Sequence, residues 1–391
     1  IMSHLSSIYS QSVTDGVWER SDHGPFGYSD GDEVESHIAS IIAARTDCTV
    51  LSQELRSHIV DWPTRYHLSQ QRANLLRPLR ANLTGTVLEI GSGCGAITRY
   101  LGETASSVTA LEGSRRRAHI TRLRTRDQHN VEVVCDEFSA FQTEQRFDAV
   151  TLIGVLEYAN LFVQGEHAAL RMLSKAKESL NNNGCLIIAI ENQLGLKYWA
   201  GAPEDHLGQA MLGLEDKYQT GGVRTYGKQG LSDLLKNAGF ECIEFLYPFP
   251  DYKLPSCVLT DQAFSDPAFD PTPFLISTAN HDPQLPADLA FSLERVWPVI
   301  HTNKLASDLS NSFLVIARAQ GQLCASMDMS TIRTLAWHYS TQRLPQYCKE
   351  TIFQKSVDGI GITVTRQTLS PEIYTIDHSS GISHRVEDGT P

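Results

Sequence analysis

The stretch Val87-Leu-Glu-Ile-Gly91-Ser-Gly93-Cys-Gly95 decides the fold. A mostly apolar strand ends there in a glycine-rich turn, and residues 96–101 continue as a helix-like segment. Gly91 permits a sharp turn, and Gly93 lets a ligand approach the backbone because no Cβ stands in the way. The first N–H groups of the following helix can bind an anionic group. The pattern therefore predicts a ligand-binding loop in an α/β sheet.

Three acids stand at the ends of three successive predicted strands. Glu89 lies beside the glycine turn, where a carboxylate suits a ligand with an ammonium group better than one with a pyrophosphate. Glu112 follows 23 residues later and is placed to accept hydrogen bonds from ribose hydroxyls. Asp136, after the third strand, can accept a hydrogen bond from an adenine amino group. Ala96 occupies the position of the third glycine in the dinucleotide fingerprint G-x-G-x-x-G, so the loop departs from that fingerprint.

The chain around this loop alternates short apolar strands with amphipathic helices from residue 66 to about residue 318. This alternation is typical of an α/β sheet. Helical spacing is clear at Ala169, Leu173 and Ala176, which share one face. Seven strands are predicted, at residues 86–90, 107–111, 131–135, 147–153, 185–190, 241–246 and 312–317.

The predicted domain organisation has three parts. Residues 1–65 form a leader with a helical cap, and residues 66–319 form the main domain. Within that domain the intervals 192–225 and 247–311 are too long for simple connections, and such loops are usually lids or substrate-binding elements. For residues 320–391 we expect a small β-rich extension or the start of a further domain.

Composition narrows the choice of partners and location. The chain has 391 residues and a formal net charge of −12, which argues against nucleic acid because phosphate binding needs a basic face. No apolar run is long enough to cross a bilayer and no signal peptide is visible, so we expect no transmembrane segment. The eight cysteines are scattered without a C-x-x-C pair, which indicates thiols in a reducing compartment. We therefore expect a cytoplasmic protein.

With these residues, segment 66–318 resembles the class I S-adenosylmethionine-dependent methyltransferases. The resemblance implies a Rossmann-like seven-stranded sheet with helices on both faces, an antiparallel last strand, and S-adenosylmethionine as the cofactor. It places the glycines at the methionine part of the cofactor, Glu89 at its amino group and Glu112 at the ribose. It also places Asp136 and Glu137 beside the adenine. The implied cofactor residues are Tyr66, Glu89, Gly91, Gly93, Gly95, Glu112, Asp136 and Glu137.

Several longer stretches of the sequence indicate a more specific resemblance within this class. They are similar to the methyltransferase domains of bacterial surface-polysaccharide enzymes, which methylate O-antigen or a similar glycan, often at its terminal sugar. Such domains are commonly fused to a kinase or a glycosyltransferase. The resemblance therefore implies a saccharide acceptor, including a lipid-linked glycan at the inner face of the membrane. The strings are Tyr66-His-Leu-Ser, Arg72-Ala-Asn-Leu-Leu-Arg-Pro-Leu, Leu152-Ile-Gly-Val-Leu-Glu-Tyr-Ala, residues 191–206, and Tyr247-Pro-Phe-Pro-Asp-Tyr-Lys-Leu-Pro.

Methyl transfer to a sugar hydroxyl benefits from a general base at the carboxyl ends of the strands. We expect His206 to be the base, because its unperturbed pKa lies near neutral pH. Glu157 and Asp205 are the further catalytic candidates. The structural alternatives are an ordinary surface role for His206 and a capping or cofactor-shell role for Glu157. Aromatic faces beside carboxylates and amides suit sugars, and on that pattern the substrate-binding candidates are Glu191, Asn192, Tyr198, Trp199, Asp251 and Tyr252.

We expect no metal ion, because nothing in the spacing of the candidate acids and His206 demands one. Two other functions stay open. A methyltransferase of a small metabolite or peptide would have a closed pocket under the lid. A non-catalytic scaffold for a glycosyltransferase would bind the cofactor weakly or not at all, and the intact glycine loop with Glu89 and Glu112 argues against it.

Overall fold

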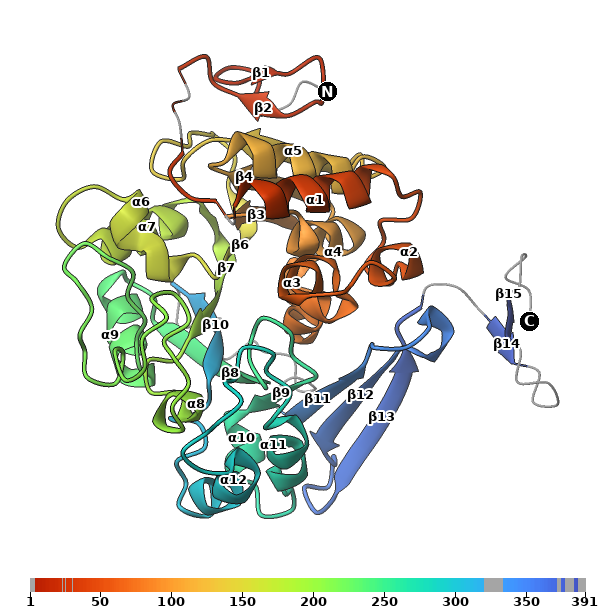
Figure 1. The fold of residues 1–391 in the computed structure, drawn as a ribbon, viewed down its shortest axis with the longest axis vertical. Coiled ribbons are helices and arrows are strands. Elements are labelled where there is room, and N and C mark those ends of the chain that lie inside the picture. Colours follow the sequence, from red (N-terminus) through yellow and green to blue (C-terminus); the bar gives the residue numbers. More distant parts are fainter. Residues whose placement is uncertain are drawn as a thin grey trace.

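The structure is a computed structural model. It describes residues 4–22, 24, 26–29, 31–319 and 333–370, and the backbone of residues 374–376 and 383–385. Within these ranges thirteen strands form one sheet, in the order β1-β2-β5-β4-β3-β6-β7-β10-β8-β9-β11-β12-β13 (Figure 1).

The middle of this sheet contains all seven predicted strands. From one side to the other they lie in the order β5-β4-β3-β6-β7-β10-β8. Strand β10 pairs antiparallel with both β7 and β8, as the resemblance implies for the last strand. The bounds are β3 (Thr86–Ile90), β4 (Ser107–Glu112), β5 (Val131–Cys135), β6 (Phe147–Ile153), β7 (Leu180–Glu191), β8 (Cys242–Phe249) and β10 (Ser312–Arg318).

The sheet is larger than the seven strands that we expected. At one edge the leader adds a hairpin whose second strand runs parallel to β5. At the other edge β9 joins residues 333–370 to the sheet, because β9 pairs with both β8 and β11. Residues 320–332, where the predicted extension begins, lie outside the described ranges. The added strands are β1 (Ser10–Gln11), β2 (Trp18–Glu19), β9 (Cys257–Thr260), β11 (Thr334–Ser340), β12 (Lys349–Lys355) and β13 (Ile362–Thr368), and β14 (Tyr374–Ile376) pairs with β15 (Ser383–Arg385) in a separate sheet.

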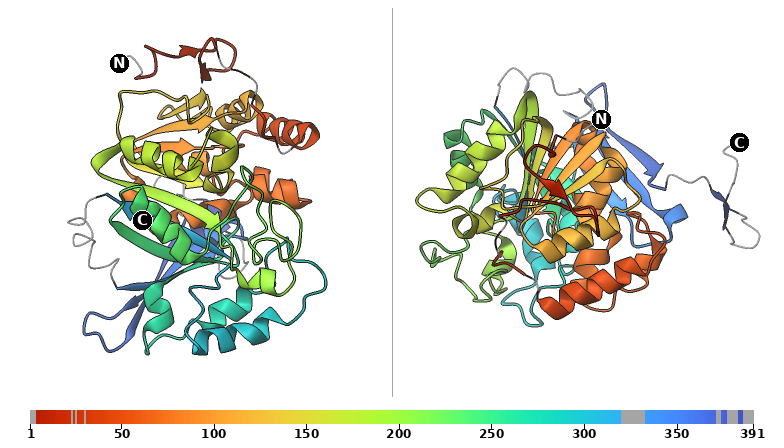
Figure 2. Two further views of the ribbon diagram at one scale, coloured as in Figure 1. Left: turned by 90° about the vertical axis from the view of Figure 1, so that its left-hand side faces the viewer. Right: turned by 90° about the horizontal axis from the view of Figure 1, so that it is seen from above.

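Helices cover both faces of the central strands. Successive side chains of a strand point to opposite faces, so a strand with apolar residues at successive positions contributes to a core on each face. Val87 belongs to a core that includes Ile97 and Leu101 of α4 (Ala96–Thr104). The next residue, Leu88, belongs to a second core with Leu173 of α7. Figures 1 and 2 show α4 and α5 on one side of the central strands and α7 and α9 on the other. The remaining bounds are α5 (Arg115–Arg124), α7 (Ala168–Glu178) and α9 (Lys228–Asn237).

The predicted leader helix is α1 (Asp32–Ala43), and it packs on the outside of α5. Ile38 and Ile42 share a small core with Ile120 of α5. Further along, the chain reaches β3 through short helical turns. These are α2 (Gln53–Arg56), α3 (Trp62–Leu68), η1 (Gln70–Leu75) and η2 (Arg77–Leu83).

One of the two long intervals is more ordered than its composition suggests. The interval 247–311 contains β9 and three helices, and Trp297 of the last helix is buried against Phe249 with ring centroids 5.5 Å apart. The remaining helices are η3 (Leu156–Tyr158), α6 (Ala159–Phe162), α8 (Leu196–Trp199), α10 (Asp261–Ser265), α11 (Thr272–Thr278), α12 (Leu293–Thr302) and η5 (Pro345–Tyr347).

Two composition-based expectations can be compared with the structure. Among the described residues no helix is long and apolar enough to span a membrane. Cys242 is disulfide-bonded, which the scattered spacing of the cysteines did not predict. Six other cysteines are free and buried: Cys48, Cys94, Cys135, Cys185, Cys257 and Cys348.

Candidate functional site

A cavity of about 410 Å³ lies at the carboxyl ends of β3, β4, β6 and β7, where α/β sheets bind ligands. Most of the residues predicted from the sequence line it. These are Tyr66, Glu89, Gly91, Gly93, Glu112, Asp136, Glu137, Glu157, Glu191, Asp205, His206 and Tyr252.

The glycine loop forms one wall of this cavity. At two of its positions, Gly91 and Gly95, the backbone conformation and the neighbouring atoms leave no room for a larger residue. Gly91 has a φ of 75°, and a Cβ there would lie 2.6 Å from Cγ2 of Val155. Gly95 has a φ of 78°, caps the N-terminus of α4, and would place a Cβ 3.0 Å from the Cα of Thr121. Gly95 does not line the cavity, but it turns the chain into the helix. A side chain at either position would therefore clash with the packed protein and change the path of the loop.

Glu112 holds this loop in place. Its carboxylate accepts hydrogen bonds from the backbone N–H of Gly93 at 2.8 Å and of Ser114 at 3.0 Å. Since the carboxylate also lines the cavity, it can contact a ligand that rests on the loop.

Glu89 is a buried acid that a positively charged ligand group would stabilise. Burial raises the pKa of its carboxyl to about 7, a hydrogen bond from the Thr98 hydroxyl at 2.5 Å opposes the rise, and the nearby charge of Glu112 adds to it. An ammonium group bound there would favour the ionised form. The donor set of Glu89, Glu112 and the glycine loop thus fits the amino acid and ribose parts of S-adenosylmethionine.

Asp136 already has partners from the leader. Its Oδ2 accepts a hydrogen bond from the Tyr9 hydroxyl at 2.7 Å, and Arg20 contacts both carboxylate oxygens at 3.0 and 3.1 Å. The leader reaches Asp136 because β2 pairs with the end of β5. The expectation that Asp136 receives an adenine amino group therefore competes with an ion pair inside the protein. Glu137 lies next to it on the cavity wall.

Tyr66, which the resemblance implies as a cofactor residue, lies on another wall of the cavity. The guanidinium of Arg72 stacks 4.4 Å from the centre of its ring. Arg72 also donates a hydrogen bond of 2.7 Å to the backbone oxygen of Lys253. Lys253 lies at the far end of the cavity, the end lined by Glu157, Glu191 and His206.

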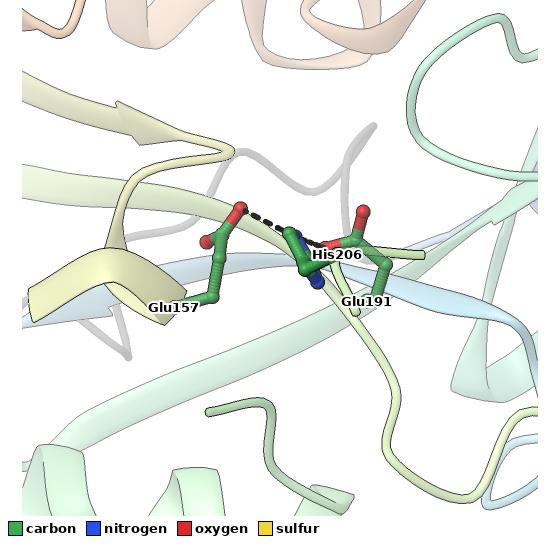
Figure 3. Close-up of side chains that lie close together, drawn as sticks. All are labelled: Glu157, Glu191 and His206. Carbon is green, nitrogen blue, oxygen red and sulfur yellow. Dashed lines mark ion pairs between the residues drawn. The ribbon is translucent and has the colours of Figure 1, made fainter. Parts of the chain in front are cut away.

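Glu157, Glu191 and His206 meet at that far end (Figure 3). The Nε2 atom of His206 lies 3.6 Å from Glu157 and 3.7 Å from Glu191, and its Nδ1 atom lies 2.8 Å from Glu204. Burial alone would lower the pKa of His206, but these carboxylates outweigh it and raise the pKa to about 11. His206 is therefore protonated at neutral pH, and the unperturbed pKa for which we chose it as the base does not apply here.

Asp205 belongs to a buried network of charges. Burial by itself would raise the pKa of its carboxyl, but Lys197 at 2.9 Å and Lys253 at 3.2 Å lower it well below its usual range. The Tyr198 hydroxyl donates a further hydrogen bond to it at 3.1 Å. A carboxylate held in this way does not take up a proton near neutral pH, so its geometry is that of a positioning residue rather than a base.

The predicted substrate residues divide between the cavity and its surroundings. Glu191 and Tyr252 line the cavity, whereas Asn192, Tyr198 and Asp251 are buried behind it. Trp199, the expected sugar platform, is 49% exposed, does not line the cavity, and donates from Nε1 to the backbone oxygen of Leu194 at 3.2 Å. The short helix α8 turns Lys197 and Tyr198 inward and leaves Trp199 outside, so Trp199 lies apart from the predicted substrate residues that line the cavity.

Several cavity residues were missed by the sequence analysis. Lys253 follows Tyr252 within a string that we had already singled out, and its Nζ lies 2.6 Å from Glu191. Phe26 and Tyr28 reach the cavity from the leader and pack against Phe162 and Tyr158, with ring centroids 5.2 and 5.1 Å apart. The aromatic residues of the leader were the available signal.

Comparison with known proteins agrees with this geometry. Residues 88–186 match the sequence profile of a family described as "Methyltransferase domain". This part of the chain therefore matches a methyltransferase domain, and its cofactor is S-adenosylmethionine.

Individual proteins add little to that assignment. No curated protein matches the chain significantly. Among solved structures, the chain is similar to an S-adenosylmethionine-dependent methyltransferase from Clostridium acetobutylicum, with 13% identity, coverage of 49% of this chain and 86% of that chain, and a TM-score of 0.35. It is also similar to the N-methyltransferase NodS from Bradyrhizobium japonicum with bound S-adenosyl-L-homocysteine, with 15% identity, coverage of 55% and 89%, and a TM-score of 0.35. At such low TM-scores we draw nothing from these two matches.

Proposed function

We propose that the chain methylates a hydroxyl group of a saccharide acceptor in a bacterial surface polysaccharide of the O-antigen type, at the end of the growing glycan. The observation that carries the proposal is the far end of the cavity. There Glu157 is 1% exposed and its Oε2 atom has no hydrogen-bond partner among the described residues. A buried, unpaired carboxylate oxygen beside a ligand cavity is suited to accept a proton from a hydroxyl group.

Glu157 is the general base in this proposal. Burial is the main cause that raises the pKa of its carboxyl, and a raised pKa makes the carboxylate a stronger proton acceptor. The His206 imidazolium lies 3.6 Å away and offsets the negative charge of Glu157 and Glu191. S-adenosylmethionine supplies an electrophilic methyl group when it is bound at the glycine loop.

The other residues at this end orient the acceptor. Lys253 and the Tyr252 hydroxyl both contact Oε1 of Glu191, at 2.6 and 3.3 Å, so the position of that carboxylate is fixed. Asp205 in turn holds Lys253 at 3.2 Å. Carboxylates, an ammonium group and a phenol around one cavity are groups that bind sugar hydroxyls by hydrogen bonds.

The glycan assignment rests on the residue strings quoted above. With it we propose a lipid-linked acceptor, a location at the cytoplasmic face of the inner membrane, and a kinase or glycosyltransferase as the functional partner.

The test is methyl transfer from labelled S-adenosylmethionine to a panel of O-antigen oligosaccharides, peptides and small metabolites. We expect an oligosaccharide product heavier by one methyl group, and a loss of kcat of about 10²–10⁴-fold in Glu157→Gln. The control is Glu144→Gln, since Glu144 is an exposed acid outside the cavity. Transfer to peptides or metabolites alone would overturn the glycan assignment. Cofactor binding without transfer to any acceptor would favour the scaffold function.

A further inference from the structure

The three side chains at the far end of the cavity come from separate parts of the chain. Glu157 lies in η3, Glu191 is the last residue of β7, and His206 lies in the loop after α8. One donor atom of each lies within 4.8 Å of the other two. Figure 3 shows the imidazole between the two carboxylates.

The distances within this group differ from those of hydrogen bonds. Nε2 of His206 is 3.6 and 3.7 Å from the nearest oxygens of Glu157 and Glu191, whereas N–H···O hydrogen bonds are usually about 2.7–3.2 Å long. Two ligands that bind one ion at about 2.1 Å lie about 3.0–3.4 Å apart in octahedral or tetrahedral geometry. The observed spacing is thus nearer to that of donors around a shared ion.

Both carboxylates also have one oxygen atom that makes no hydrogen bond within the described part of the chain, although Oε2 of Glu191 forms an ion pair with His206 at 3.7 Å. Oε2 of Glu157 and Oε2 of Glu191 are buried and have no hydrogen-bond partner among the described residues, and the two side chains are 1% and 0% exposed. Burial of a charged group without a partner is costly. Oε2 of Glu191 faces Nε2 of His206 at a distance too long for a hydrogen bond, and both carboxylates line the cavity, so a cation bound within this group would satisfy that oxygen.

The surrounding residues orient these donors. Glu204 contacts Nδ1 of His206 at 2.8 Å and so leaves Nε2 facing the two carboxylates. Carboxylates commonly hold metal-binding histidines in this way. Oε1 of Glu191 is fixed by Lys253 and Tyr252, which leaves its Oε2 turned to the group.

We propose that Glu157, Glu191 and His206 bind one divalent transition-metal ion, with Mn²⁺ and Zn²⁺ as the best candidates. One imidazole nitrogen and two carboxylate oxygens suit these ions better than Mg²⁺ or Ca²⁺, which prefer oxygen ligands alone. All three residues line the cavity. The proposal reverses our expectation of a metal-free site, and it does not depend on which acceptor is methylated. The ion takes the place of the Nε2 proton of His206. Its ligand from Glu157 is Oε1, the oxygen that lies 3.6 Å from Nε2, so Oε2 of Glu157 stays available to accept a proton.

The test is metal binding itself, measured on chelator-treated protein. Mn²⁺ is titrated and followed by electron paramagnetic resonance, and Zn²⁺ is titrated by calorimetry. We expect one equivalent of ion per chain, with an affinity at least about tenfold lower in Glu191→Gln and Glu157→Gln. The exposed Glu144→Gln variant is the matched control and should bind like the wild type.

The role of the imidazole needs a separate readout. Co²⁺ bound to the wild type should give visible absorption bands that change in His206→Ala, because a nitrogen ligand is lost. Thermal unfolding and S-adenosylhomocysteine binding show whether each variant is folded. The proposal is overturned if folded wild-type protein binds no stoichiometric ion. It is equally overturned if the same ion binds unchanged to Glu191→Gln and His206→Ala, which would indicate an adventitious ion only.

Discussion

Lowering the pH from about 8 to about 6 should weaken S-adenosylhomocysteine binding about tenfold. The reason is Glu89, whose carboxyl has a pKa raised to about 7, mainly by burial. The carboxylate is the form that pairs with the ammonium group of the ligand. About nine tenths of it is ionised at pH 8 and about one tenth at pH 6, and the apparent affinity follows that fraction.

Glu89→Gln should remove this pH dependence of binding. At pH 8 it should also make the folded protein more stable, although it weakens ligand binding. Because the folded-state pKa lies above the ordinary value of 4.5, the folded chain holds the proton more tightly than the unfolded chain does. Its stability therefore falls as the pH rises from that ordinary value towards the folded pKa, by about 3 kcal/mol in total. The uncharged glutamine avoids this loss, so at pH 8 the variant should unfold at a higher temperature and bind the ligand more weakly.

The assay is calorimetry at several pH values, in buffers with different heats of ionisation, so that proton release on binding is measured directly. Thermal unfolding of both proteins is recorded in parallel. Equal affinity at pH 6 and pH 8, or the same pH dependence in Glu89→Gln, would refute the role of Glu89.

Three further predictions concern the loop, the charged network and the surface. Gly91→Ala places a Cβ 2.6 Å from Val155 at a φ of 75°, so it should cost about 1–3 kcal/mol of unfolding free energy and weaken S-adenosylhomocysteine binding; an unchanged denaturation midpoint would contradict the strain argument. Lys197→Met leaves Asp205, Asp251 and Asp282 without their shared ammonium group, and urea denaturation should show a loss of about 3–5 kcal/mol. Trp199→Ala should change stability by less than about 0.5 kcal/mol and leave methyl transfer intact, because Trp199 is exposed outside the cavity; a selective rise in the acceptor KM would restore its predicted role in sugar binding.

The part of the fold that the sequence predicts well is the part built from local patterns. The alternation of Val87 and Leu88 between two cores, and the glycines that end β3, are visible in a short stretch of chain. The added strands are different, since β1 and β2 have two residues each and join the sheet only because β1 pairs with β2 and β2 pairs with β5. Strands this short carry no periodic signal of their own.

The site shows the same contrast. The residue types that line the cavity were predictable, because acids at the ends of parallel strands meet at one edge of the sheet. Their protonation was not, since the high pKa of His206 depends on three carboxylates from η3, β7 and its own loop. The partners of Asp136 were equally out of reach, because Tyr9 and Arg20 lie more than a hundred residues away in the chain.

The central claim is that S-adenosylmethionine binds between the glycine loop and Glu112. It is tested most directly by calorimetry of S-adenosylhomocysteine with the wild type, Glu112→Ala and the exposed control Glu144→Ala. We predict one binding site per chain in the wild type and the control, and no measurable binding in Glu112→Ala that has the same thermal unfolding profile as the wild type. No binding by the folded wild type, or unchanged binding by Glu112→Ala, would contradict the claim.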